Sequence, residues 1–163
     1  MRSSIPEKVD RFLDLVKLIG GLIKNKSLKS FNGKIYRASF LKEELIKNIK
    51  IGQAMINSAF WSSSKKESVA KKFLKKNYKN TLIIANGGLN NNVDIHLEGI
   101  SKYPHEEEVL FLPFCVFTIK SFNKVKELGL DYYILELENA SDSSIIEPYS
   151  DETINGLNGK NRF

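Results

Sequence analysis

The sequence predicts an α+β protein, with helices mainly in the first half of the chain and strands in the second. Apolar residues recur every three or four positions in residues 4–23 and 42–57, as in helices with one buried face. From residue 81 onward, short apolar runs are separated by polar or glycine-containing loops, as in a β-sheet. Because helices come early and strands late, the pattern favours an α+β fold over a βαβ alternation.

The first expected helix begins with a capping box, in which Ser4 is the N-cap and Glu7 lies three residues later. Gly20 and Gly21 should weaken this helix or divide it, because glycine is a poor helix former. Its apolar face consists of Val9, Phe12, Leu13, Val16, Ile19 and Ile23.

The remaining elements follow from local patterns. Alternation predicts a strand at 34–40, and helical spacing predicts a helix at 42–57. A second capping box, Ser64 with Glu67, predicts a short helix. The inner face of that helix is formed by Val69, Ala70, Phe73 and Leu74. Further strands are expected at 81–85, 93–95, 106–112, 115–119 and 130–137, and a strand end or turn at 60–64.

The composition describes a foldable chain of 163 residues with a net charge of +6 and 42% hydrophobic residues. The single cysteine, Cys115, excludes a disulfide framework and a thiolate zinc site. The N-terminus lacks the apolar run of a signal peptide, and no apolar run reaches the roughly 20 residues that span a bilayer. We expect one soluble domain, residues 1–149, with a helical lead-in at 1–30 and a flexible tail at 150–163.

Three short motifs carry the functional signal: Tyr36-Arg37-Ala38, Phe60-Trp61-Ser62-Ser63-Ser64 and Glu106-Glu107-Glu108-Val109-Leu110. Each is weak alone, because arginines on strands usually form ion pairs, serine runs make turns, and glutamate runs are usually solvated. The third motif is unusual because it continues into an apolar strand. Strand alternation would put Glu106 and Glu108 on one face and Glu107 on the other. Two such carboxylates repel each other unless a ligand or hydrogen-bond donors face them.

In order and spacing, these motifs resemble the arginine–serine–glutamate class of mono-ADP-ribosyltransferases, the NAD-arginine ADP-ribosyltransferase family. This family includes vertebrate arginine-specific ecto-enzymes and several bacterial toxins. The resemblance covers residues 33–137, with Ser63 where the family usually has threonine. It implies N-terminal helices followed by two packed, mainly antiparallel β-sheets that form an NAD cleft. It also implies NAD as co-substrate and a protein acceptor modified on arginine. Separately, we expect no metal, because His96 has no partners with metal-ligand spacing.

The resemblance assigns four residues to NAD binding. Arg37 would anchor the pyrophosphate, because its guanidinium donates two parallel hydrogen bonds that lysine cannot copy. The backbone of Ala38 would bind the nicotinamide amide, and Ser62 would bind the nicotinamide ribose or orient Glu108. The two serines after Ser62 would shape the turn and cap the next helix. Phe73 has two interpretations, a helix core residue or a ring that stacks on nicotinamide.

The acidic motif would supply the chemistry. Glu108 is the expected catalytic residue, which stabilises the oxocarbenium ion formed when nicotinamide leaves. Glu106 would face the incoming arginine, and Glu107 is expected to be dispensable. The loop at 100–105 would contact the protein acceptor, with Tyr103 as the aromatic residue that touches it.

Two alternatives remain open at this stage. The same residues would serve an NAD glycohydrolase, in which water replaces the acceptor. A different class is a basic nucleic-acid-binding module, which would use the lysine run Lys65, Lys66, Lys71, Lys72, Lys75, Lys76 and Lys79. A solvated lysine face explains the same run and makes nucleic acid an unexpected partner.

We expect a monomer that binds no membrane, located in the cytoplasm or delivered into a host cytoplasm as a toxin or effector.

Overall fold

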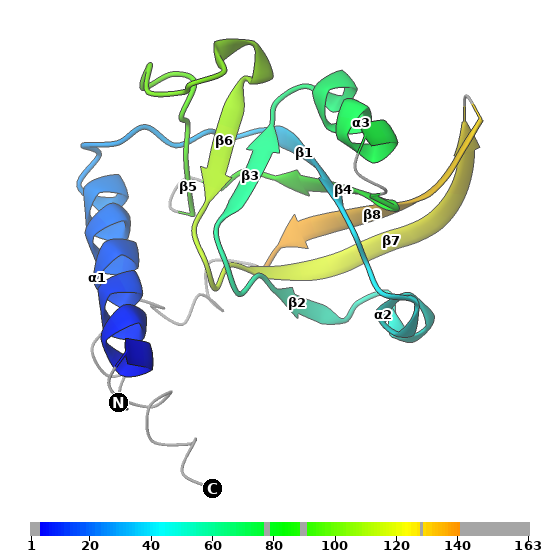
Figure 1. Ribbon diagram of the computed structural model, residues 1–163, viewed down its shortest axis with the longest axis horizontal. Coiled ribbons are helices and arrows are strands. Elements are labelled where there is room, and N and C mark those ends of the chain that lie inside the picture. Colours follow the sequence, from blue (N-terminus) through cyan, green and yellow to red (C-terminus); the bar gives the residue numbers. More distant parts are fainter. Residues whose placement is uncertain (1–3, 77–78, 89–90, 128, 141–163) are drawn as a thin grey trace, which may run out of the picture.

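The computed structural model describes residues 4–76, 79–88, 91–127 and 129–140, which form helices on the outside of a strongly twisted sheet (Figure 1). The helices are α1 (Ser4–Lys24), α2 (Glu43–Asn48) and α3 (Glu67–Lys76), and a 3₁₀ turn covers Pro104–Glu106. The strands are β1 (Lys34–Ser39), β2 (Ala54–Ile56), β3 (Trp61–Ser64), β4 (Thr81–Asn86), β5 (Asn92–Val93), β6 (Glu108–Phe111), β7 (Val116–Glu127) and β8 (Leu130–Asn139).

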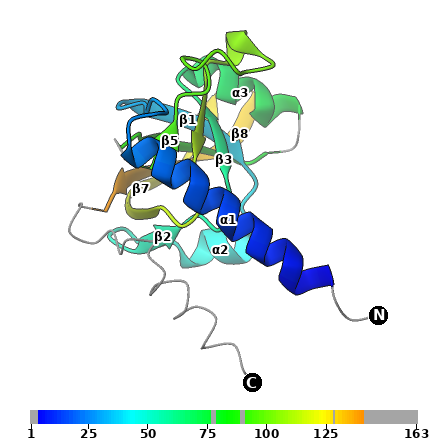
Figure 2. The ribbon, with the colours of Figure 1, turned by 90° about the vertical axis from the view of Figure 1, so that its left-hand side faces the viewer.

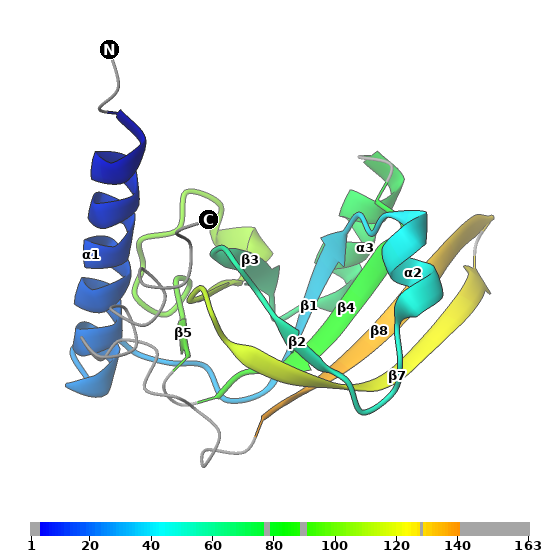
Figure 3. The same ribbon diagram turned by 90° about the horizontal axis from the view of Figure 1, so that it is seen from below.

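The eight strands of the described residues form one hydrogen-bonded sheet, in the order β2-β7-β8-β4-β1-β3-β6-β5. All neighbouring strands are antiparallel except β4 and β8. Strands β1 and β3 join at the single register pair Tyr36 and Ser64, whereas β1 and β4 pair along their whole length. The sheet therefore has two halves, β5-β6-β3 and β1-β4-β8-β7-β2, connected by a narrow seam (Figure 3).

The two halves pack against each other through aromatic side chains. The Phe117 ring of β7 stacks on the Trp61 ring of β3, with centroids 5.6 Å apart and planes 4° apart. It also contacts Phe111 of β6 at a centroid distance of 5.9 Å. The predicted α+β class with two packed β layers is thus confirmed, with the difference that the seam between β1 and β3 joins the layers into one sheet.

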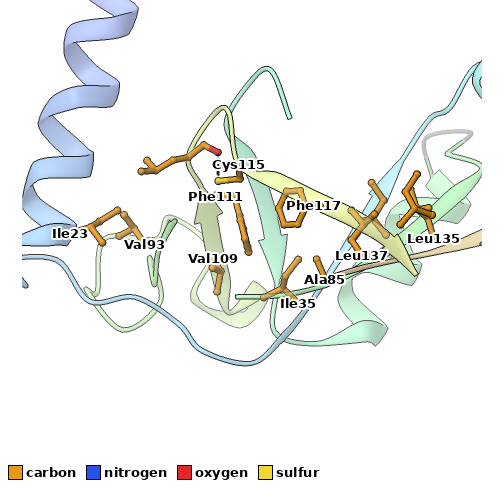
Figure 4. Close-up of a cluster of buried hydrophobic side chains, with 13 residues drawn as sticks. Ile23, Ile35, Ala85, Val93, Val109, Phe111, Cys115, Phe117, Leu135 and Leu137 are labelled. Atoms are coloured by element: carbon orange, nitrogen blue, oxygen red, sulfur yellow. Dashed lines mark hydrogen bonds between the residues drawn. The ribbon is translucent and has the colours of Figure 1, made fainter. Parts of the chain in front are cut away.

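The main core lies between these layers (Figure 4). Ile35, Phe111 and Phe117 are completely buried, and Cys115 is 8% exposed. Burial raises the pKa of the Cys115 thiol to about 12, so the thiol stays protonated and donates to the Leu112 carbonyl at 3.1 Å. Cys115 therefore behaves as a small buried apolar residue.

We expect Phe117→Ala to destabilise the protein strongly, because Phe117 contacts both layers and its removal leaves a cavity between them. The expected loss in the free energy of unfolding is about 3–5 kcal/mol. Chemical denaturation followed by circular dichroism measures it. Ile51→Ala is a matched control, because Ile51 is 72% exposed and its truncation should change stability by no more than about 0.5 kcal/mol. Equal losses in the two variants would contradict this account of the core.

Helix α1 lies along the side of the sheet that ends in β5 (Figure 2). Val16 and Ile23 are buried, and the Phe12 ring meets Phe60 edge-on with centroids 5.8 Å apart. Val9, expected on the inner face, is 47% exposed. The helix continues through the two glycines to Lys24, so tertiary packing outweighs their low helix propensity.

The predicted helix at 42–57 is wrong in its second half. Helix α2 ends at Asn48, and a turn leads into β2. Gly52 has a φ of 82°, which favours glycine, and its N–H donates to the Ile119 carbonyl at 2.8 Å. Strand β2 then pairs with β7, with Met55 opposite Phe117. Because this partner is distant in the sequence, the apolar spacing of 42–57 cannot distinguish the short strand from another helical turn.

The end of strand β7 also differs from expectation. Strand β7 continues to Glu127 instead of ending at residue 119, because its polar second half pairs with β8 in a long hairpin. The expected tail at 150–163 lies outside the described residues, so the domain boundary at 149 stays a prediction. In the part of the chain that the structure describes, no helix has the length and apolar character to cross a membrane.

Candidate active site

A cleft of about 230 Å³ opens where β1 and β3 meet, beside helix α3. All three sequence motifs contribute to its walls, although they are far apart in the chain. The residues that line it are Tyr36, Arg37, Ala38, Ser62, Ser63, Ser64, Val69, Ala70, Phe73, Lys79 and Glu106. The residues of the cleft thus include two cations, a carboxylate and two aromatic residues.

Arg37 is held on β1 by contacts to the neighbouring strand. Its Nη1 donates to the Ser62 carbonyl at 2.5 Å, and the guanidinium carbon lies 5.8 Å from the centre of the Trp61 ring. Burial lowers the pKa of Arg37, since desolvation disfavours its charge. Within the described residues, the guanidinium has a carbonyl and a ring as neighbours and no carboxylate in ion-pair contact. Its positive charge is therefore available to an anionic ligand.

Ser62 and Glu108 are joined across the β3–β6 ladder. The Ser62 hydroxyl donates to Glu108 Oε1 at 2.6 Å, which fixes the carboxylate of Glu108 beside the cleft. The register explains the contact, because Ser64 is opposite Glu108 and Ser62 lies two residues away on the same face. Ser62 lines the cleft directly, so this hydrogen bond connects Glu108 to the cleft wall.

The expected strand at 106–112 begins later than the sequence suggested, and this changes the relation among the glutamates. Strand β6 starts at Glu108, Glu106 belongs to the 3₁₀ turn, and Glu107 is left-handed with a φ of 46° and a ψ of 56°. Strand alternation therefore does not place Glu106 beside Glu108, and that expectation is wrong. Glu106 nevertheless lines the cleft, while Glu107 pairs with Lys66.

The serines of the second motif divide their roles. Ser64 Oγ accepts from the Lys66 N–H at 2.9 Å and donates to the Glu106 carbonyl at 2.6 Å, so it shapes the turn. Glu67, the expected capping partner, pairs instead with Lys71 at 2.9 Å. Ser63 is 6% exposed, and its hydroxyl has no hydrogen-bond partner among the described residues.

The aromatic candidates differ in their surroundings. Phe73 lines the cleft and is 38% exposed, whereas Ala70 and Leu74 form the buried face of α3. This exposure favours the ring-in-cleft interpretation of Phe73 over the core interpretation. Tyr103 is 50% exposed in the loop before the 3₁₀ turn and does not line the cleft.

Sequence reasoning missed Lys79 as a cleft residue and counted it only within the lysine run. The next residue, Asn80, holds this segment in place before β4. The Asn80 side chain bonds both the N–H and the carbonyl of Leu41 at 2.8 Å, and its N–H donates to the Ser39 carbonyl at 3.1 Å. No local pattern marks Lys79, because the contacts that hold this segment are made by Asn80 to residues far away in the sequence, Ser39 and Leu41.

Three lysines of the run are engaged in ion pairs. Lys65 pairs with buried Asp94 at 2.6 Å, Lys66 pairs with Glu107, and Lys71 bonds Glu67 and Glu127. These pairs reduce the positive charge that a nucleic acid would meet. In the described part of the chain, no three His, Cys, Asp or Glu side chains gather as a metal site. That the reaction needs no metal stays a prediction.

The side chains in and beside the cleft can bind an anion, stack on a planar group and stabilise a developing positive charge. A guanidinium and an ammonium can hold an anionic ligand, and an aromatic ring can stack on a planar or cationic group. A carboxylate fixed by a serine hydroxyl can stabilise a cation that develops nearby, provided that water is partly excluded. Glu108 is linked to the cleft through Ser62, whereas the other carboxylate, Glu106, lines the cleft itself and comes to it from the 3₁₀ turn.

A model of the NAD:arginine ADP-ribosyltransferase family matches residues 21–144 of the chain. Direct comparison with curated protein sequences gives no match. Among solved structures, the Vis toxin, an ADP-ribosyltransferase from Vibrio splendidus, is similar with a TM-score of 0.56 and 24% identity. The similarity covers 72% of this chain and 52% of the toxin, so the chain spans about half the length of that relative.

Two other solved structures are similar over more of this chain. Plx2a, an ADP-ribosyltransferase toxin from Paenibacillus larvae, has a TM-score of 0.59 and 19% identity over 86% of this chain and 74% of the toxin. Exoenzyme S from Pseudomonas aeruginosa, in complex with human 14-3-3 protein beta and bound to carba-NAD, has a TM-score of 0.57 and 15% identity, covering 84% of this chain and 62% of its own. At these identities the likenesses show the fold alone, and they confirm the fold that the three motifs predicted.

Proposed function

Because this chain belongs to the NAD:arginine ADP-ribosyltransferase family, we propose that it cleaves the nicotinamide–ribose bond of NAD and transfers ADP-ribose to an arginine of a protein acceptor. The hydrogen bond between Ser62 and Glu108, at the wall of a cleft that also contains Arg37, is the observation that carries the proposal. Ser62 thus contacts both groups, since its hydroxyl donates to the Glu108 carboxylate, which is suited to an oxocarbenium ion, and its carbonyl accepts from Arg37, which is suited to a pyrophosphate.

In the proposed reaction, the bond between ribose C1′ and the nicotinamide nitrogen breaks, and its electron pair leaves with neutral nicotinamide. The positive charge moves to the ribose, where the Glu108 carboxylate stabilises it. A guanidine nitrogen of the acceptor then bonds to C1′ and loses a proton. Ser62 holds Glu108 in place and binds the ribose.

Arg37 would bind the pyrophosphate, and its half-buried setting favours this role. Electrostatic attraction between a guanidinium and a phosphate is stronger where the local dielectric constant is lower. The Phe73 ring, exposed in the cleft, would stack on nicotinamide, and the backbone of Ala38 would bind its amide.

The acceptor would approach from the side of the 3₁₀ turn, which carries Glu106 into the cleft. Glu106 would orient the guanidinium of the acceptor arginine and take up its proton. The preceding loop contains Leu97, Ile100 and Tyr103, which are 54%, 66% and 50% exposed and suit contact with a protein. We propose Tyr103 as an acceptor contact on this ground.

We expect Glu106→Gln to lower transfer to arginine much more than NAD hydrolysis, because the amide cannot take a proton from a guanidinium. Transfer to arginine methyl ester should fall by about 100-fold. Transfer is measured as modified acceptor by mass spectrometry. NAD hydrolysis is measured as nicotinamide release by chromatography, with and without the acceptor. An equal loss of both activities would contradict a role specific to the acceptor.

The activity itself is tested by incubating the protein with NAD and a cell lysate, followed by mass spectrometry of the lysate proteins. The proposal predicts nicotinamide release and ADP-ribose on arginine side chains. Nicotinamide release that is unchanged by any acceptor would support the glycohydrolase instead.

The toxins among the similar structures support the further proposal that the chain acts as a toxin or effector in a host cytoplasm. We propose that it acts there as a monomer.

A further inference from the structure

Glu107 has an unusual backbone conformation between the two proposed functional glutamates. Its φ of 46° and ψ of 56° lie in the left-handed region, which glycine adopts easily and a residue with a Cβ disfavours. Glutamate is thus an unfavourable choice for this position on backbone grounds. Such a residue at a candidate site suggests that its side chain contributes something that glycine lacks.

The Glu107 side chain makes an ion pair between its Oε1 and Lys66 Nζ, at 2.5 Å. The hydrogen bond from Lys66 lowers the pKa of Glu107, because the ammonium favours the charged form of the carboxylate. Lys66 lies between β3, which carries Ser62, and α3, which carries Phe73. The ion pair therefore connects the turn of the glutamates to the segment that carries the proposed NAD-binding residues.

Hydrogen bonds to the backbone of the turn reinforce the same connection. The Lys65 N–H donates to the Glu107 carbonyl at 3.2 Å, and Ser64 Oγ donates to the Glu106 carbonyl at 2.6 Å. On the other side of the turn, the His96 N–H donates to the Glu108 carbonyl at 3.1 Å. Glu106 reaches the cleft from this short 3₁₀ turn, so the placement of its side chain depends on how firmly the turn is held.

We propose that Glu107 is a positioning residue, which through its ion pair with Lys66 holds the turn so that Glu106 faces the cleft and arginine is favoured over water as acceptor. This inference rests on the proposed transferase function and replaces the expectation that Glu107 is dispensable. Glu107 acts only through Glu106, since it does not line the cleft. Its loss should therefore affect the second step of the reaction, attack by the acceptor, more than NAD cleavage.

The first test is Glu107→Gln, assayed for transfer to arginine methyl ester and for NAD hydrolysis without acceptor. A small displacement of Glu106 should lower kcat/KM for the acceptor by about tenfold, while hydrolysis changes by no more than about twofold. Glu138→Gln is the matched control, because Glu138 forms a comparable exposed ion pair with Lys120 at 2.8 Å, on the β7–β8 hairpin. The control should leave both activities unchanged.

Two further variants separate positioning from stability. Glu107→Gly relieves the left-handed backbone but removes the carboxylate, so its melting temperature should equal or exceed that of the unaltered protein while transfer stays low. The charge-reversed double variant, Lys66→Glu with Glu107→Lys, restores an ion pair and should recover roughly half or more of the lost transfer. This recovery would not be expected if the carboxylate of Glu107 itself acted on the acceptor, because the double variant has an ammonium group at that position.

Several results would overturn the proposal. An unchanged ratio of transfer to hydrolysis in Glu107→Gln and Glu107→Gly would refute it while leaving the transferase function intact. An equal change in Glu138→Gln would also refute it, because the effect would then follow from the loss of any exposed carboxylate. Absence of NAD cleavage by the unaltered protein would overturn the proposed function and this inference together.

Discussion

Replacing Glu108 with glutamine is expected to abolish most NAD cleavage, with nicotinamide release lowered by at least about 100-fold. The amide is nearly the same size as the carboxylate, so the side chain should still fit beside Ser62. It carries no negative charge, however, and cannot stabilise the cation that develops on the ribose. Release of nicotinamide from NAD, measured by chromatography with and without an arginine acceptor, gives the rate of both reactions.

The β7–β8 hairpin offers a matched control for this variant. The Ser121 hydroxyl donates to Glu136 Oε2 at 2.7 Å, which reproduces the serine–glutamate hydrogen bond of the cleft at a different place in the sheet. Glu136→Gln should therefore leave nicotinamide release unchanged. Full activity of Glu108→Gln would show that Glu108 is not the catalytic carboxylate, and equal losses in the two variants would point to a general structural effect.

Arg37→Lys is expected to have the second largest effect, although it preserves the charge. Lysine cannot donate two parallel hydrogen bonds to a pyrophosphate, and it loses the geometry that holds Arg37 to the Ser62 carbonyl and over the Trp61 ring. We expect kcat/KM for NAD to fall by about 100-fold, mainly through a higher KM. Initial rates of nicotinamide release over a range of NAD concentrations measure this change.

Arg11→Lys on helix α1 is the control for the same chemical change outside the cleft, and its KM for NAD should not move. An unaltered KM in Arg37→Lys would contradict the role of Arg37 as pyrophosphate anchor. Circular dichroism of both variants shows whether the fold is retained, which matters because Arg37 also contacts the neighbouring strand.

The sequence predicted best those elements whose burial is nearly complete. Strand β4 has four buried residues among six, and the apolar run at 81–85 identifies it directly. Strand β2 has only three residues, and its pairing with β7 defines it as a strand. Such pairing depends on a distant part of the chain, so the local apolar spacing favours a longer helix instead.

In the candidate site too, local patterns identify some residues, whereas the placement of others depends on the folded chain. Arg37 and Ser62 can be identified from short motifs, and both line the cleft. The relation of Glu106 to Glu108 cannot be identified from the sequence, because the left-handed conformation of Glu107 interrupts the strand. The residue type at position 107 does not signal that conformation. Lys79 escapes prediction for a different reason, since its approach to the cleft results from tertiary packing alone.

The narrow seam between β1 and β3 has a thermodynamic consequence for a ligand in the cleft. Arg37 lies on one side of the seam, and Ser62 and Glu108 lie on the other, while Tyr36 and Ser64 are the single register pair between the two strands. A dinucleotide held by residues on both sides would act as a cross-link between the halves of the sheet. Its binding free energy would stabilise the domain where neighbouring strands share the fewest register pairs, so occupancy of the cleft and resistance to unfolding would rise together.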